Sequence, residues 1–187
     1  MASSDTQDQI LDAVQSVIVR EGVRGASMRN VAEEADVSVG LLSYHFDDKQ
    51  SLIVAAFDRA TTALLAASTA SAAAVSGDEE KVKAFLRGAF TENFLTGDYL
   101  RLRISLWAVA LTDPAVSRLD AEYSATYTTM WKGLVAAARP ELTDDEVAAR
   151  VTDAITTSNG VWLNWARYQN QVDLERGLRL AEEVVLR

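Results

Sequence analysis

Apolar residues recur every three or four positions along almost the whole chain, and proline interrupts this pattern only at Pro114 and Pro140. This spacing is typical of amphipathic helices, and the alternation expected of strands is hard to find. We therefore predict an all-α protein with nine helices. In chain order, they cover residues 5–21, 28–35, 38–45, 49 to the alanine-rich stretch 66–77, 82–94, 99–111, 114–139, 143–169 and 173–187.

Composition narrows the class of protein further. The 187 residues are 49% apolar, enough for a substantial core in one large or two small domains. With no cysteine and one histidine, disulfides, cysteine redox chemistry and multi-histidine metal sites are excluded, and we expect no metal or cofactor. Asp5, Asp8 and Asp12 give the N-terminus the wrong charge for a signal peptide, and the run 63–75 is too short to span a bilayer. We expect a cytoplasmic protein that does not enter a membrane.

Two short helices joined by a tight turn are predicted between residues 27 and 46. Ser27 is placed to cap the first helix, and Asp36-Val37 forms the turn. Ser38 is placed to cap the second helix, and Asp48 the long helix that follows. This arrangement is typical of a DNA-binding helix-turn-helix.

The same stretch resembles the DNA-binding signature of the TetR family of transcriptional repressors. From Ser27 to Lys49 it reads SMRNVAEEADVSVGLLSYHFDDK, which contains the family patterns Ala-x-x-Ala-x-Val-Ser and Gly-x-x-x-Tyr-x-Phe-x-x-Lys. The resemblance implies a DNA-binding domain over residues 5–60 and a ligand-binding and dimerisation domain over 61–187. The later part resembles the choline-sensing BetI branch through Leu106-Trp107-Ala108, Asp113-Pro114 and the stretch 159–163.

The residues of this motif suggest how DNA is contacted. Gly40 lacks a side chain, which lets the backbone approach base edges or phosphates, and Val39 and Leu41 are suited to thymine methyl groups. We expect the groove to be contacted by Val39, Gly40, Ser43, Tyr44 and His45, and phosphates by Ser27, Arg29, Ser38 and Lys49.

Aromatic residues are concentrated in the later part of the chain, which holds all four tryptophans and four of the five tyrosines. Such residues either form a core or line a ligand cavity. The candidates for contacts with a small effector are Asn93, Trp107, Tyr123, Tyr127, Trp131, Asn159 and Trp162. The BetI resemblance favours a cationic effector held by cation–π contacts, whereas Arg101 and Arg103 favour an anion, and the sequence leaves both open.

The last two long helices offer apolar faces for a homodimer, as the family resemblance implies. The predicted interface comprises Val151, Ile155, Ser158, Trp162, Leu174, Leu178, Ala181 and Val185. A dimer would place two reading helices on the half-sites of a palindromic operator.

These features predict a ligand-responsive transcriptional repressor that is released from DNA by an effector. The alternative is a helical small-molecule-binding protein or enzyme in which the helix-turn-helix is incidental. Catalysis is not expected, because the acidic pairs are adjacent in sequence and most lie at predicted helix N-termini, where they favour the helix dipole.

The formal charge is −9, and residues 1–60 alone hold five basic against ten acidic side chains. We therefore expect few Lys or Arg contacts to phosphate.

Overall fold

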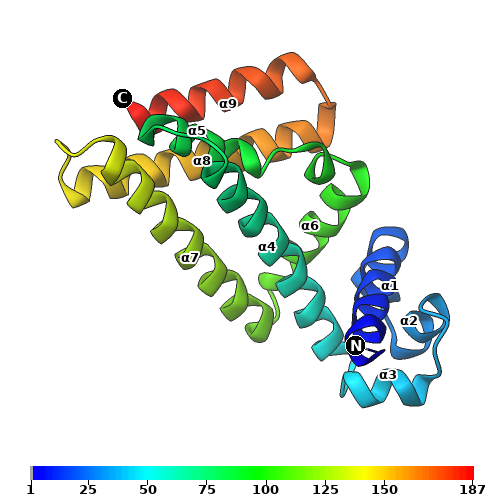
Figure 1. Ribbon diagram of the computed structural model, residues 1–187. Helices are drawn as coiled ribbons and strands as arrows, with labels where there is room; N and C mark the ends of the chain where they lie inside the picture. The colour runs from blue at the N-terminus through cyan, green and yellow to red at the C-terminus, as the bar shows by residue number, and fades with distance from the viewer. Residues whose placement is uncertain (1) are drawn as a thin grey trace. The chain divides into compact units, whose positions relative to one another are not determined.

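A computed structural model describes residues 2–187, with side chains from Asp5 onward. Over this range it contains nine α-helices and one short 3₁₀ helix and no strand, so the predicted all-α class is confirmed (Figure 1). The elements are α1 (Ala2–Gly25), α2 (Met28–Glu34), α3 (Val39–His45), α4 (Lys49–Ala73), α5 (Asp78–Gly88), η1 (Glu92–Phe94), α6 (Gly97–Ala110), α7 (Pro114–Ala138), α8 (Asp144–Tyr168) and α9 (Gln171–Leu186).

The chain divides into two compact units. The first comprises the chain up to Thr62 together with Asp98–Glu122, and the second comprises Ala63–Gly97 together with Tyr123–Arg187. Helices α4 and α7 therefore begin in the first unit and end in the second. Segment 98–122, which we predicted to belong to the second domain, is part of the first compact unit. The functional division at residue 60 stays a prediction.

The core of the first unit is built on one face of α1. Ile10, Val14 and Val17 are fully buried there, at the helical spacing seen in the sequence. They belong to one hydrophobic cluster with residues of α2, α3, α4 and α6, including Val31, Leu42, Leu52, Phe57 and Leu106. The α-helical stretch of α1 is interrupted at Gly22, whose φ of 72° is readily adopted only by glycine. The helix predicted to end at Glu21-Gly22 is kinked there, and α1 continues to Gly25.

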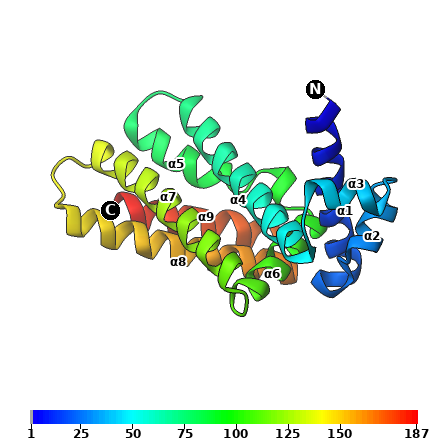
Figure 2. The ribbon, with the colours of Figure 1, turned by 90° about the horizontal axis from the view of Figure 1, so that it is seen from below.

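The second unit is organised by the antiparallel pair α8 and α9, which lie side by side in both views (Figures 1 and 2). A Cβ at Gly177 would lie 2.5 Å from Val161 Cγ2, so glycine permits this close packing. Arg87 on α5 forms ion pairs with Glu175 and Glu182 on α9, at 3.1 and 2.6 Å. These contacts hold α5 against the pair.

Several helix boundaries differ from the prediction, among them the start of α1 at Ala2 and of α5 at Asp78. The helix expected over residues 82–94 ends at Gly88, and Phe94 lies in η1. A Cβ at Gly88 would lie 2.6 Å from Ser68 Cα, so α5 ends where it crosses α4 closely. The last helix is capped by Asn170, whose side chain accepts hydrogen bonds from the Val172 and Asp173 amides, and not by Asp173.

Among the described helices, α4 is long and apolar enough to cross a membrane by length and composition alone. That is weak evidence, because core helices of soluble proteins meet the same criterion. The buried side chains Leu52, Ala56 and Phe57 place the start of α4 in the hydrophobic core of the first unit.

The turn between α2 and α3 depends on one residue in the left-handed region. Asp36 has a φ of 50°, and its amide donates to the Glu33 carbonyl, while the Val37 amide donates to the Ala32 carbonyl. This pair of hydrogen bonds is the Schellman ending of a helix, in which glycine usually takes the left-handed position. Aspartate tolerates that conformation better than most residues, but at a cost that glycine avoids.

Replacing this aspartate should therefore change stability in opposite directions depending on the substitute. We expect Asp36→Gly to raise the melting temperature by about 1–3 °C, and Asp36→Ala, which removes the same charge, to lower it. Thermal unfolding followed by circular dichroism measures both. Equal shifts for the two variants would show that charge, and not backbone conformation, decides the effect.

Candidate functional site

Helix α3 has one face in the core and one outside. The side chains of Leu42 and Phe46 are buried at 0 and 5% exposure. Ser38 caps the helix by accepting a hydrogen bond from the Leu41 amide at 3.1 Å, and Ser27 caps α2 in the same way through the Asn30 amide. These two caps and the turn between them fix the direction in which α3 presents its outer face.

The outer face of α3 carries large apolar side chains in the open. Val39 is 46% exposed, Leu41 41% and Tyr44 81%. Ser43 and Gly40 are also exposed, and a Cβ at Gly40 would meet no atom closer than Ser38 Oγ at 3.9 Å. Glycine inside a helix costs about 1 kcal/mol relative to alanine. No contact inside the protein requires a glycine at this position.

The remaining residues predicted to contact DNA surround this face. Arg29 is exposed on α2, and half-buried His45 packs edge-on against Tyr44, with ring centroids 5.3 Å apart. Lys49, predicted to hold a phosphate, donates from Nζ to the Arg24 carbonyl at 2.9 Å. Ser27 and Ser38 are occupied as caps. All nine predicted residues lie on or beside α2 and α3.

Most basic side chains of the helix-turn-helix region already have partners inside the protein. Arg20 forms ion pairs with Glu21 and Glu34, at 3.0 and 2.9 Å. A hydrogen bond from Ser16, reinforced by Arg20, holds the pKa of the Glu34 carboxyl below its usual value. Arg59 pairs with Asp12 at 2.5 Å. Arg24 and Arg29 remain as exposed guanidinium groups.

In the second unit, three of the predicted effector residues form an aromatic cluster on α7. Tyr123, Tyr127 and Trp131 follow one another at helical spacing, with ring centroids 6.1 and 5.8 Å apart. Phe85 on α5 packs against Tyr127 at 4.9 Å and Trp131 at 6.0 Å. Trp131 is completely buried, and its indole N–H has no hydrogen-bond partner. A buried donor without a partner is unusual and calls for an explanation.

The other predicted effector residues lie elsewhere. Trp162 is buried against Phe90, with centroids 5.0 Å apart, and Asn93 and Asn159 are exposed. Trp107 belongs to the first unit, where the Arg103 guanidinium lies 4.8 Å above its ring. Phe85 and Phe90 were missed because their helical spacing marks them as core residues. Their ring contacts with α7 and α8 become visible only in the structure.

The residues predicted to form a dimer interface are placed differently from the expectation. Seven of the eight are buried within the protomer, and Ile155 is half-buried. Buried side chains offer little surface to a second copy, and the interface itself stays a prediction. The faces were assigned from apolar spacing, which finds a buried stripe without showing what buries it.

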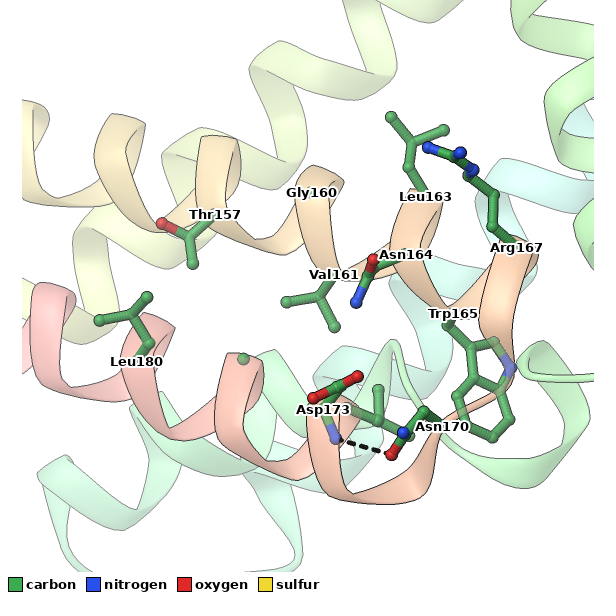
Figure 3. Close-up of a pocket in the computed structure, with 12 residues that line it drawn as sticks. Thr157, Gly160, Val161, Leu163, Asn164, Trp165, Arg167, Asn170, Asp173 and Leu180 are labelled. Atoms are coloured by element: carbon green, nitrogen blue, oxygen red, sulfur yellow. Dashed lines mark hydrogen bonds between the residues drawn. The ribbon is translucent and has the colours of Figure 1, made fainter.

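A groove of about 390 Å³ lies instead on the outer side of α8 and α9. Thr157, Gly160 and Asn164 line it from α8, and Gly177 and Leu180 line it from α9 (Figure 3). Two leucines that line the groove are exposed to solvent, Leu163 at 49% and Leu180 at 51%. Gly160 is also exposed, and a Cβ there would meet no atom within 4 Å.

Comparison with known families matches both parts of the chain. Residues 10–56 match the family described as bacterial regulatory proteins, tetR family. Residues 78–187, more than half of the chain, match the family described as BetI-type transcriptional repressor, C-terminal.

Relatives and solved structures agree with this assignment. The chain is 25% identical over 178 residues to an HTH-type transcriptional regulator BetI of Paraburkholderia phymatum, a match covering 95% of this chain and 89% of that protein. A transcriptional regulator of Pseudomonas aeruginosa PAO1 has the same fold, with a TM-score of 0.88, 21% identity and coverage of 99 and 90%. A regulator of Saccharomonospora viridis solved in complex with choline superposes with a TM-score of 0.78 at 14% identity, covering 97 and 96%.

The helix-turn-helix fold, the matched residues and the relatives agree on the class of protein. This chain belongs to the TetR family of bacterial regulatory proteins, with a BetI-type C-terminal part, and is a transcriptional regulator rather than an enzyme.

Proposed function

We propose that the protein is a homodimeric repressor that reads a palindromic operator with α3 and leaves it when a small effector binds the second unit. The observation that carries the DNA-binding part is the outer face of α3. Tyr44, Val39 and Leu41 are exposed there around Gly40, and packing inside the protein does not require a glycine at that position. Helix-turn-helix proteins place this second helix in the major groove. A regulator of this kind works beside the chromosome, so we place it in the cytoplasm.

Replacing Gly40 should affect stability and DNA binding in opposite directions. Gly40→Ala should raise the melting temperature by about 2–4 °C, because alanine favours a helix and meets open space. The added methyl should hold α3 away from the groove and weaken operator binding by roughly tenfold or more. Differential scanning fluorimetry and fluorescence anisotropy on an operator duplex measure the two effects.

Gly133→Ala is the matched control. This exposed glycine lies on α7 in the second unit, and a Cβ there also meets no atom within 4 Å. We expect the same gain in stability with no loss of affinity. If Gly40→Ala binds the operator as tightly as the control, α3 does not approach DNA through Gly40.

The scarcity of exposed cations predicts a shallow salt dependence. With Arg24 and Arg29 exposed and Lys49 beside them, each protomer neutralises two or three phosphates, and a dimer four to six. The slope of log K against log salt should then be about −4 to −5, since each neutralised phosphate of B-DNA contributes about −0.9. Operator titrations between about 50 and 300 mM KCl measure the slope. A slope steeper than about −8 would mean that other cations reach the DNA.

The outer groove of α8 and α9 supports the proposal of a dimer. Gly160 lacks a side chain, which lets a helix of a second copy approach closely. The exposed leucines Leu163 and Leu180 beside it offer apolar surface for that copy to bury. The rim carries both signs of charge, with Arg176 and Arg179 next to Asp173 and Glu183. When two copies meet across a two-fold axis, the basic side chains of one copy can face the acidic side chains of the other. We therefore assign dimerisation to this groove, in place of the buried residues predicted from the sequence.

Leu180→Glu tests this assignment. Two unpaired carboxylates would be buried in each dimer, so self-association should weaken by at least about a hundredfold. Sedimentation velocity should show monomers at concentrations where the wild type is dimeric. Leu111→Glu, at a leucine in the turn after α6 that is 87% exposed, is the control and should leave the dimer intact. A dimeric Leu180→Glu protein would contradict the interface.

The aromatic cluster of α5 and α7 supports an effector site in the second unit. The unpartnered indole N–H of Trp131 is a donor that an effector oxygen would satisfy. Tyr127 and Tyr123 add aromatic rings of the kind that attract an organic cation. Choline combines a hydroxyl oxygen with a quaternary ammonium group, and the Saccharomonospora viridis relative was solved in complex with it. An effector of this class releases DNA only if it binds the DNA-incompetent state more tightly.

Trp131→Phe keeps an aromatic ring and removes the donor. Choline should raise the melting temperature of the wild type and release it from operator DNA, whereas Trp131→Phe should bind choline about tenfold more weakly. Trp165→Phe is the control, because its indole N–H already donates to the Leu95 carbonyl at 2.9 Å. That variant should be less stable but retain the choline-induced shift. Equal choline affinities in all three proteins would exclude this cluster.

A further inference from the structure

The exposed residues of α3 form a ridge with two flanks. Residues of an α-helix are about 100° apart, and the buried side chain of Leu42 defines the inner side. Gly40 and Tyr44 then lie opposite the core, in the centre of the outer face. Val39 and Leu41 are exposed on opposite sides of the helix, about 120° and 80° from this centre. The two aliphatic side chains therefore face different positions in a groove.

The chemistry of α3 is unusual for a helix that reads DNA. Its sequence, VGLLSYH, contains no Arg, Lys, Asn, Gln, Asp or Glu. Those side chains make the paired hydrogen bonds that distinguish guanine and adenine, or accept from cytosine, in the major groove. Hydroxyl groups, such as those of Ser43 and Tyr44, contact several bases and discriminate less. The imidazole of His45 is half-buried and packs edge-on against Tyr44, so on the exposed face apolar contact remains for discrimination.

Long polar side chains near α3 are held elsewhere. Asn30 Nδ2 donates to the Gly25 carbonyl at 3.0 Å, Lys49 Nζ to the Arg24 carbonyl at 2.9 Å, and Gln50 Nε2 to Asp113 Oδ1 at 3.3 Å. Arg29 is exposed, but it belongs to α2, and the first helix of such a motif crosses the DNA backbone. These positions leave base reading to α3 itself.

We infer that this protein reads its operator through the C5 methyl groups of thymine, using Val39 and Leu41 at two separate positions of each half-site. The thymine methyl is the one apolar group that B-DNA offers in its major groove, and aliphatic side chains are suited to it. The operator is specified by A·T pairs at these positions and is insensitive to the N7 acceptor of guanine. This inference rests on the proposed DNA-binding role of α3 and adds the class of base that it reads.

The test begins by selecting binding sites for the full-length protein from random duplex DNA. The selected duplex is then synthesised with deoxyuridine, which lacks the C5 methyl, in place of one thymine at a time. At two positions per half-site, uracil should weaken binding about three- to fivefold, the loss expected for one buried methyl group. Replacing guanines with 7-deazaguanine should change the affinity less than about twofold, since no guanine N7 contact is lost.

Variants assign the two positions. Val39→Ala should abolish the thymine–uracil difference at one position and Leu41→Ala at the other. Val172→Ala, at a valine of α9 that is 74% exposed, should leave both differences unchanged.

A selected site that is insensitive to uracil, or weakened by 7-deazaguanine, overturns the inference but leaves the repressor function standing. If no sequence is enriched, sequence-specific DNA binding fails, and the inference fails with it.

Discussion

A seven-residue helix is not stable by itself in water, so α3 exists only because its neighbours hold it. Leu42 and Phe46 fix one side of it in the core of the first unit. The left-handed turn at Asp36 and the Ser38 cap fix where it starts. The outward direction of Gly40 and Tyr44 follows from these contacts. Readout of DNA therefore depends on the packing and turn geometry of residues that never touch it.

Acidity and DNA binding are reconciled by how the few cations are used. Arg20 and Arg59 pair with carboxylates of their own unit, and Lys49 ties the start of α4 to the end of α1. These basic side chains stabilise the unit and add little to a general attraction for phosphate. Such a protein gains relatively little from non-specific binding, so discrimination depends more on the shape and apolar chemistry of α3.

How well the sequence predicted the fold depended on whether the signal was local. The caps at Ser27, Ser38 and Thr143 were predicted correctly, because a capping side chain contacts a backbone amide only two or three residues away. The end of α5 at Gly88 was missed, because the apolar spacing continues through Phe90 and Phe94 beyond the helix. The dimer face was assigned to residues that the protomer buries, since an apolar stripe has the same spacing whichever surface covers it. Three of the four residues of the aromatic cluster were predicted, because Tyr123, Tyr127 and Trp131 share α7, whereas Phe85 on α5 was missed.

The glycines within helices fall into two groups, those that packing inside the protomer requires and those that it does not. Gly88 and Gly177 are explained inside it, because a Cβ at either would clash with α4 or α8. Gly40 and Gly160 are not explained inside it, although each costs about 1 kcal/mol of helix stability relative to alanine. One lies at the centre of the face proposed to enter DNA and the other in the groove proposed to meet a second copy. Gly133 on α7 has the same open space, so such a glycine supports a partner surface only together with other observations, here the exposed apolar side chains around Gly40 and Gly160. The proposed DNA-reading and dimer surfaces thus share one physical signature, and neither depends on positive charge.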